Sequence, residues 1–175
     1  ECGSPLAPAK EGDIDLRCYF NPKWTNTPDA YEWSKPLLTI QDVLFGHEGS
    51  HEPASLADMP RGTRISTSLG YTYPSLEPLF ARGDAQRDDS VDEEKVLLKM
   101  TADRTPYGVT KSNALDWYRK STPQHKLASW RLVLESADVH CAVPKNAAIP
   151  ASRTLAALEE LRKTGRVDAI LRTYR

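Results

Sequence analysis

The sequence has 175 residues, of which 39% are hydrophobic and 27% are charged, and its formal net charge is -1. This length suits one globular domain or two small lobes that share a chain. Near-neutral charge argues against nucleic acid or an anionic membrane as the main partner, and no apolar run approaches the roughly 18 residues that a membrane helix needs.

The cysteines and the first residues leave the compartment open. Cys2, Cys18 and Cys141 lack the spacing of a metal site, and they agree equally with one disulfide plus a buried thiol or with three unpaired thiols. The opening ECGSPLAPAKEGD shows neither the basic region nor the apolar core of a signal peptide. It therefore agrees with a mature form, a fragment or a cytosolic protein.

In chain order, the first half of the sequence predicts short strands separated by polar connectors. Alternation of apolar and polar residues predicts a strand over 13–20, and a loop dense in turn-forming residues follows at 21–29. The remaining predicted elements are a strand at 37–45, a polar connector at 46–53, one helical turn at 55–59, a strand at 63–68 and a helix at 74–81.

The second half predicts helices between short apolar strands. Ser90 and Glu93 have the spacing of a capping box, which opens a helix to about Ala102 with an apolar stripe of Val91, Val96, Leu97 and Met100. Alternating strands and helices indicate an α/β fold with a largely parallel sheet. The further elements are a strand at 107–109, a helix to Arg119, strands at 130–134 and 139–143, and helices at 152–164 and 166–174 divided by Gly165.

The segment His47-Glu48-Gly49-Ser50-His51 matches the H-E-x-x-H pattern of zinc metalloproteases. Zinc binding requires both histidines one turn apart on a helix. Here a β-type run precedes the motif, Gly46 and Gly49 disfavour a helix, and Pro53 follows closely. We therefore expect a non-helical connector without zinc, and a zinc hydrolase is the weakest functional hypothesis.

Other catalytic patterns are thinner still. The sequence has no G-x-S-x-G nucleophile elbow and no Gly-rich phosphate loop. Cys141 lies in an apolar strand, which is typical of a structural thiol. A group of acidic residues is expected to form the solvated start of a helix: Asp88, Asp89, Asp92, Glu93 and Glu94. We expect a binding protein with neither enzymatic activity nor a cofactor.

Several motifs in fixed order resemble the type 3 extracellular solute-binding proteins, the amino-acid type that serves ABC transporters. The first are a G-x-x-D step at Gly12–Asp15 and an aromatic-Ser-x-Pro element at Trp33–Pro36. An S-L-A-D segment at Ser55–Asp58 and a Gly-Tyr turn at Gly70-Tyr71 follow them. The closing L-x-x-L-x-x-x-G-x-x-x-x-I-x-x-x-Y signature is matched by Leu158, Leu161, Gly165, Ile170 and Tyr174.

The resemblance implies a periplasmic binding protein type II-like fold, in which two α/β lobes enclose a ligand in an interlobe cleft. Lobe one would comprise residues 1–50 and 137–175, and lobe two residues 51–136. Family members have a strand, helix, strand and helix ahead of the G-x-x-D step, so lobe one is expected to be incomplete. Its strand at 13–20 would then expose an edge that pairs with another copy or a separate peptide.

The resemblance also implies which residues contact the ligand. They lie in the loop ahead of the aromatic-Ser-x-Pro element, at the strand-to-helix turn near Gly70, and at the end of the strand near residue 109. The expected ligand-binding residues are Trp24, Asn26, Thr27, Ser68, Gly70, Tyr71, Thr72, Thr110 and Lys111. A plain tight turn at Gly70, and packing of Trp24 and Tyr71 at element edges, are the structural alternatives.

Two departures bear on the ligand. The family arginine that holds a ligand carboxylate has no counterpart in residues 24–30, and Lys111 stands where the family aspartate binds an α-amino group. Lys111 would suit an acidic or phosphate-bearing ligand, and its alternative is a solvated lysine at a helix start. The resemblance implies a small polar or anionic solute, a membrane permease as partner, and a periplasmic or secreted location. A non-transport interaction or sensor module with a degenerate cleft is the alternative function.

Overall fold

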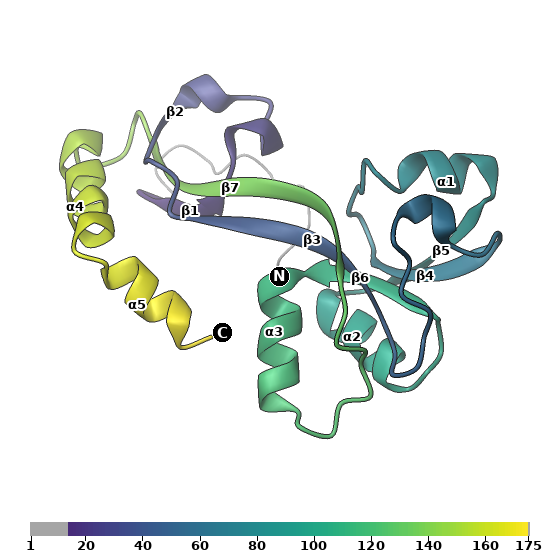
Figure 1. The fold of residues 1–175 in the computed structure, drawn as a ribbon. Helices are drawn as coiled ribbons and strands as arrows, with labels where there is room; N and C mark the ends of the chain where they lie inside the picture. The colour runs from purple at the N-terminus through teal and green to yellow at the C-terminus, as the bar shows by residue number, and fades with distance from the viewer. Residues whose placement is uncertain (1–13, 175) are drawn as a thin grey trace. The chain divides into compact units, whose positions relative to one another are not determined.

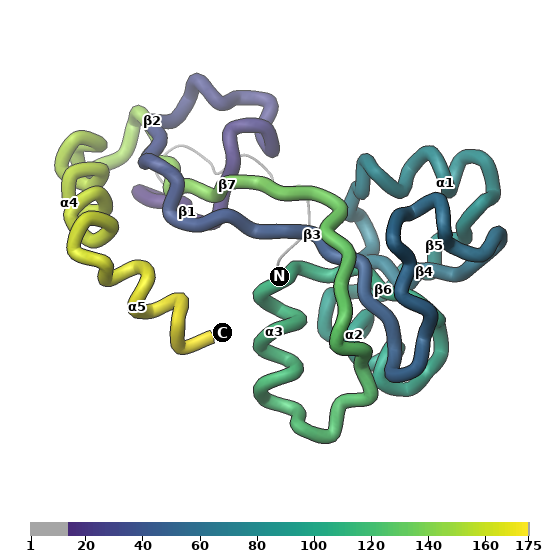
Figure 2. Tube along the Cα trace, in the orientation of Figure 1, coloured from purple at the N-terminus to yellow at the C-terminus, as the bar shows by residue number. Residues whose placement is uncertain are grey.

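The computed structural model describes residues 14–174, which divide into two compact units (Figure 1). The central unit is Gln41–Ser136, and the terminal unit combines residues 14–40 with residues 137–174. The chain passes between the units once within β3 and once within β7, two strands that can be followed along the trace in Figure 2. The lobe boundaries expected from the resemblance remain a prediction.

The elements alternate between strands and helices over most of the described chain. Short 3-10 turns lie at Pro22–Trp24, Pro28–Ala30 and Leu56–Asp58. The strands and α-helices in chain order are β1 (Arg17–Phe20), β2 (Tyr31–Trp33), β3 (Leu38–Gly46), β4 (Thr63–Ser68), α1 (Glu77–Arg82), β5 (Ala85–Ser90), α2 (Glu93–Thr101), β6 (Tyr107–Lys111), α3 (Ser112–Ser121), β7 (Leu132–Pro144), α4 (Ala151–Lys163) and α5 (Arg166–Arg172).

The sheet of the central unit has the strand order β3-β6-β4-β5. β4 is parallel to both β5 and β6, whereas β3 is antiparallel to β6. Parallel neighbours require a long crossover, and the segments that contain α1 and α2 supply one each. The prediction of a largely parallel sheet is therefore correct for β5, β4 and β6 and wrong for the other strands, which pair antiparallel.

Two apolar clusters cover the two faces of this sheet. On the face against which α1 packs, Leu44 and Ile65 are fully buried, and on the face of α2 and α3, Val43, Phe45 and Met100 are fully buried. Successive strand residues point to opposite faces, so the run from Val43 to Phe45 contributes to both clusters. Burial of each such large side chain stabilises the fold by about 1.5–3 kcal/mol.

Gly108 allows α2 to approach the sheet closely. A Cβ atom at this position would lie 2.8 Å from Met100 Cγ and 3.2 Å from Phe45 Cε1. Both neighbours are fully buried, so neither side chain has free space into which to move. A larger residue at position 108 would push α2 away from β6.

The region around β5 contains the main errors of the sequence-based elements. Ala85–Ser90 was not predicted as a strand, yet it pairs with the whole of β4. Ser90 ends that strand, and the N-cap of α2 is Asp92, whose side chain accepts a hydrogen bond from the Lys95 amide. The predicted capping box is therefore wrong, and Val91 is not part of the apolar stripe because 74% of it is exposed. The predicted helix at 74–81 begins only at Glu77.

The H-E-x-x-H segment is not helical, as predicted. His47 forms an isolated antiparallel bridge with Leu127, and the residues after it form a turn. His47 Nε2 lies 3.0 Å from Asp103 Oδ1. The two histidines therefore do not lie one turn apart on a helix. Of the helices between residues 14 and 174, none is long and apolar enough to span a membrane.

In the terminal unit, β1 and β2 both pair antiparallel with β7. The two apolar runs predicted as separate strands at 130–134 and 139–143 form this one continuous strand. Phe20, Tyr31 and Trp33 pack together with ring centroids 5.3–5.9 Å apart, and the Arg17 guanidinium lies 3.8 Å from the Phe20 ring centroid. These contacts join β1 to β2.

A disulfide between Cys18 and Cys141 links β1 to β7. It resolves the pairing that the sequence left open, and it confirms Cys141 as structural, although as a disulfide partner instead of a free thiol. Cys2 lies outside the described residues. Within residues 14–174, β1 is at the end of the strand order with β7 as its neighbour, and the pairing of its other edge with a further chain remains a prediction.

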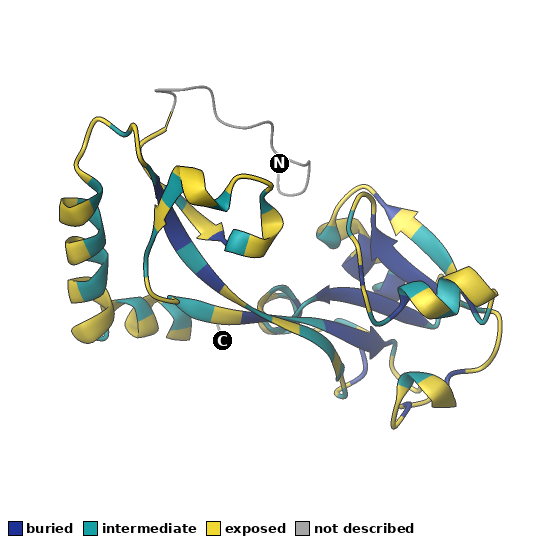
Figure 3. Cartoon of the chain, turned by 90° about the horizontal axis from the view of Figure 1, so that it is seen from above, coloured by how far each residue is buried: buried dark blue, intermediate teal, exposed yellow. Residues whose placement is uncertain are grey.

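The two C-terminal helices belong to the terminal unit, which also contains β1. Gly165 separates α4 from α5 with φ of 69°, a left-handed conformation that glycine adopts without strain. Neither helix contains a fully buried residue, and Figure 3 shows both in the exposed and intermediate colours. A groove of about 280 Å³ lies between α4 and the segment Trp33–Leu37.

Candidate functional site

The candidate site lies at the carboxyl ends of the parallel strands of the central unit. After β4 the chain enters α1 on one face of the sheet, and after β6 it enters α3 on the other face. The connections therefore leave β4 and β6 in opposite directions. In open α/β sheets, ligands bind outside the carboxyl ends of strands at such a reversal of strand order.

Ser68 and Thr110 occupy these strand ends. Because Ser66 pairs with Gly108, the same parallel register places Ser68 level with Thr110 two residues later. Both residues are about 1% exposed, and neither Ser68 Oγ nor Thr110 Oγ1 has a hydrogen-bond partner of ordinary geometry. Native proteins rarely leave buried hydroxyls unsatisfied, so two on neighbouring strands indicate a place where a ligand or water completes the bonding.

The residues after Ser68 form a tight turn. The Tyr71 amide donates to the Ser68 carbonyl at 3.2 Å, and Gly70 has φ of 80°, which requires glycine or strain. We call this segment, residues 68–71, the β4 turn. The resemblance implied a strand-to-helix turn at this place, but α1 begins only at Glu77 and has six residues. Thr72 is exposed beyond the turn.

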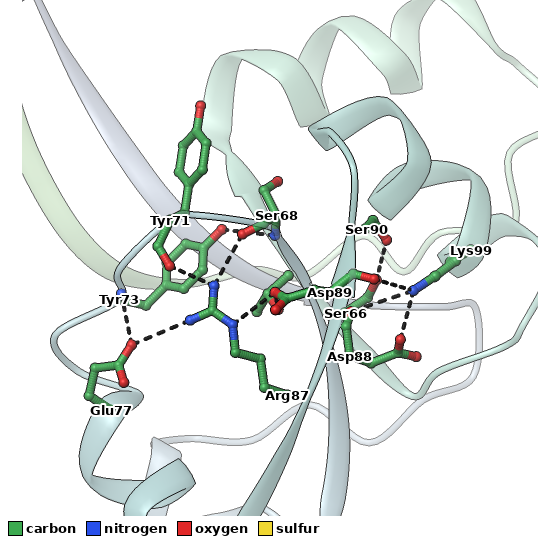
Figure 4. Close-up of polar contacts among 11 residues, drawn as sticks. Ser66, Ser68, Tyr71, Tyr73, Glu77, Arg87, Asp88, Asp89, Ser90 and Lys99 are labelled. Atoms are coloured by element: carbon green, nitrogen blue, oxygen red, sulfur yellow. Dashed lines mark hydrogen bonds and ion pairs between the residues drawn. The ribbon is translucent and has the colours of Figure 1, made fainter. Parts of the chain in front are cut away.

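Arg87 on β5 contacts the β4 turn from below (Figure 4). Its Nη2 donates to the carbonyls of Ser68 at 3.1 Å and Tyr71 at 2.6 Å. Its Nε donates to Asp89 Oδ1 at 2.8 Å, and Nη1 lies 3.4 Å from Glu77 Oε1. The guanidinium is therefore held between two carboxylates and two backbone carbonyls, a pattern that its fork of donors matches.

Lys111 is neither solvated nor an unpaired cation. Its Nζ lies 2.6 Å from Asp42 Oδ1, and the two side chains are 15% and 16% exposed. The ammonium also lies 5.6 Å from the Tyr71 ring centroid. Asp42 is directly opposite Lys111 in the β3–β6 register, so strand pairing brings the two charges together. Lys111 thus enters the site as one half of an ion pair.

Glu93, the first residue of α2, adds a second carboxyl group beside this pair. Burial raises the pKa of Glu93, and the nearby Lys111 ammonium opposes that rise. Glu93 also lies near Thr110, although the Thr110 hydroxyl makes no hydrogen bond of ordinary geometry. Burial likewise raises the pKa of Tyr73 to about 12, and the Tyr73 hydroxyl accepts a hydrogen bond from the Ser68 amide.

Asp88 and Asp89 of the acidic cluster make structural contacts. Asp88 Oδ1 accepts from Lys99 Nζ at 2.7 Å, and Asp89 accepts from both Thr67 and Arg87. Only the residues from Asp92 onward belong to a helix start, so the expectation of a helical acidic cluster is wrong for Asp88 and Asp89, which lie on β5.

The three remaining predicted ligand-binding residues are in the terminal unit. Trp24 ends a 3-10 turn with 47% of its surface exposed, and Asn26 and Thr27 are exposed in the loop that follows. Thr27 contacts Thr25, with 3.3 Å between their hydroxyl oxygens. Their participation in ligand binding remains a prediction. The central unit brings together Ser68, Gly70, Tyr71, Thr110 and Lys111.

Sequence reasoning missed three residues of the site: Asp42, Arg87 and Glu93. Asp42 carried a detectable signal, because it is the only charged residue in the apolar run LLTIQDVLF. Arg87 and Glu93 gave no such signal, since charged residues surround both in the sequence.

Comparison with known proteins defines the fold. No family model matches the chain. A reconstructed ancestral cationic amino acid solute-binding protein shares 14% identity, with a TM-score of 0.70 over 93% of this chain and 70% of its own. The arginine-binding protein ArgBP of T. maritima, as its P235GK mutant, shares 17% identity with a TM-score of 0.67 over 92% of this chain and 69% of its own. The chain has the periplasmic binding protein type II-like fold.

The chain also resembles a further solved structure and part of a DNA ligase sequence. The GluR0 ligand-binding core in complex with L-glutamate has a TM-score of 0.68 at 9% identity, over 93% of this chain and 72% of its own. A DNA ligase of Leifsonia xyli subsp. xyli is 36% identical over 106 residues, which is 58% of this chain and 13% of the ligase. Such low structural identities define the fold alone, and so short a share of the ligase transfers no ligase activity.

Proposed function

We propose that the chain binds a small polar solute, of the free amino-acid class, at the carboxyl ends of β4 and β6. The observation that carries the proposal is the pair of buried hydroxyls of Ser68 and Thr110, which are level with each other on neighbouring strands at the reversal of strand order and make no hydrogen bond of ordinary geometry. Structural relatives named for binding arginine, cationic amino acids and L-glutamate support the same class of ligand.

The polar groups around these hydroxyls support binding over catalysis. Lys111 is paired with Asp42, and Arg87 is held by Glu77 and Asp89, so these charges stabilise a fixed geometry. A polar ligand would complete the hydroxyl hydrogen bonds while Tyr71 contributes an aromatic surface. Transport with a membrane permease and a periplasmic or secreted location are part of the proposal. The Cys18–Cys141 disulfide supports the location, because disulfides persist in oxidising compartments.

The test is isothermal titration calorimetry of the purified chain with L-arginine, L-glutamate and the other free amino acids. We expect saturable binding of at least one of them. Ser68→Ala and Thr110→Val should each weaken it about two- to tenfold, since one hydrogen bond contributes about 0.5–1.5 kcal/mol. Ser66→Ala removes a buried hydroxyl two residues earlier on the same strand and should leave the affinity unchanged.

A folded chain that binds none of these amino acids would contradict the proposal. Equal loss of affinity in Ser66→Ala and Ser68→Ala would also contradict it, because the effect would then come from the packing of β4. The interaction or sensor module would be the function to pursue in either case.

A further inference from the structure

We infer that Arg87 is the positioning residue of the proposed site, acting through the β4 turn without touching the ligand. The inference rests on the proposed function, because Arg87 can position a binding site only if the chain binds a solute there. The restraint itself is argued from the contacts of Arg87. Arg87 lies in the middle of β5, a strand that sequence patterns did not reveal, and its guanidinium reaches the neighbouring β4 turn.

The contacts of Arg87 fix both ends of the turn. Nη2 donates to the carbonyl of the first residue, Ser68, at 3.1 Å and of the last, Tyr71, at 2.6 Å. Within the backbone, the Tyr71 amide donates to the Ser68 carbonyl at 3.2 Å, and the Leu69 amide donates to the Ser90 carbonyl at 2.8 Å. Charge-assisted hydrogen bonds are stronger than neutral ones, so Arg87 supplies the strongest restraint on the turn.

The same contacts prepare Ser68 for a ligand. Its amide donates to the Tyr73 hydroxyl at 3.2 Å and its carbonyl accepts from Arg87. Its own hydroxyl lies near the Tyr73 side chain but makes no hydrogen bond of ordinary geometry. Both backbone groups are therefore satisfied within the protein, and the hydroxyl is the group left for a ligand. Holding this residue before binding reduces the conformational entropy that a ligand must otherwise overcome.

Only arginine meets the geometric requirement. Glu77 and Asp89 lie on two sides of the guanidinium, and the rings of Tyr73 and Phe80 lie 5.5 Å and 6.0 Å from its central carbon. The planar fork donates to four acceptors at once, whereas a lysine ammonium is a compact charge with three donors on a flexible stem. Lysine would keep the charge and lose the simultaneous contact with both carbonyls.

The first experiment measures amide hydrogen exchange in Arg87→Lys and Arg87→Ala and needs no ligand. We expect the Leu69, Gly70 and Tyr71 amides to exchange at least about tenfold faster, the factor that one charge-assisted hydrogen bond represents. Amides of Ile65 and Val109 should keep their protection. Arg82→Ala is the matched control, because Arg82 pairs with Asp84 at 2.8 Å and does not contact the turn. Unchanged exchange in both Arg87 variants would overturn the inference.

The second experiment measures the affinity of the same variants for L-arginine and L-glutamate by calorimetry. We expect Arg87→Lys and Arg87→Ala to raise the Kd at least about tenfold, while Arg82→Ala leaves it unchanged. Faster exchange with an unchanged Kd would overturn the positioning role. A wild-type chain that binds neither probe nor any other free amino acid would contradict the proposed function, and the exchange data would still decide whether Arg87 restrains the turn. If Arg87→Ala does not fold, Arg87→Lys carries both measurements.

Discussion

The central and terminal units are stabilised by different interactions. The central unit contains two apolar clusters, one on each face of a sheet whose strands are joined by helical crossovers. The described part of the terminal unit contains neither of these clusters, and β1, β2 and β7 are held there by a disulfide and by a group of packed aromatic rings. A hydrophobic core is dense and cooperative, whereas a cross-link acts chiefly by restricting the unfolded chain.

This difference also separates the two carboxyl groups whose pKa values shift most clearly. In the central unit, burial raises the pKa of Glu93. In the terminal unit, hydrogen bonds from Arg162 and Lys35 lower the pKa of Glu159 to about 2. Burial disfavours the charged form of a carboxyl group and raises its pKa, whereas neighbouring cations at the surface favour the charged form and lower it. Four measurements test whether the two units are stabilised in these different ways.

The largest effect is expected from removing the disulfide with the double change Cys18→Ala and Cys141→Ala. The sequence separation of 123 residues predicts a loss of about 5 kcal/mol from loop-closure entropy. Hydrogen exchange should show that amides in β1 and the second half of β7 lose protection first, and that amides in β4 and β6 lose it later. Added reductant should cause no further change in the double variant. Equal loss of protection in both units would show that they unfold together.

The core of the central unit should respond to Ile65→Ala. Ile65 is fully buried, so its truncation is expected to cost about 3 kcal/mol in urea unfolding. Val91→Ala is the control, and it should change stability by less than about 0.5 kcal/mol because Val91 is 74% exposed. A cost for Ile65→Ala as small as the control would mean that the cluster is not closely packed.

Glu93→Gln should stabilise the protein at neutral pH. A carboxyl group with a raised folded-state pKa contributes stability that is present below its unfolded pKa and lost as pH rises through the folded value. Glutamine imitates the protonated form, so the variant should exceed the wild type at pH 7–8, and the gap should close below about pH 4. Urea unfolding across this range provides the measurement. A constant gap at every pH would exclude ionisation of Glu93 as its cause.

Glu159→Gln should give the smallest effect, with the opposite sign. The lowered pKa of Glu159 contributes stability above its unfolded pKa, which is lost as pH falls towards about 2. The variant should be slightly less stable than the wild type at pH 7 and equal to it near pH 2. Salt should reduce the difference, because the ion pairs with Lys35 and Arg162 lie at the surface. An effect insensitive to salt would contradict this electrostatic origin.

Local patterns in the sequence sufficed for elements with a regular spacing of apolar residues. The strand at 63–68 was predicted with its observed ends. Of the helices on both sides of Gly165, α4 starts and ends one residue earlier than predicted, and α5 starts as predicted and ends two residues earlier. The apolar run that contains Val43 and Phe45 likewise predicted β3. Periodicity and glycine turns are properties of neighbouring residues, so they can be read without knowing the fold.

The polar strand β5 and the candidate site depend on contacts between strands that are distant in sequence. The run Ala85–Ser90 is charged and shows no apolar alternation, and it becomes a strand because β4 offers an edge with which to pair. Pairing across the sheet likewise brings Asp42 to Lys111, aligns Ser68 with Thr110, and places Cys18 beside Cys141. These partners lie far apart in sequence, from 42 residues in the β4–β6 ladder pair Ser66 and Gly108 to 123 residues in the disulfide. Contacts over such distances depend on strand order and register, which the spacing of residues along one chain does not encode.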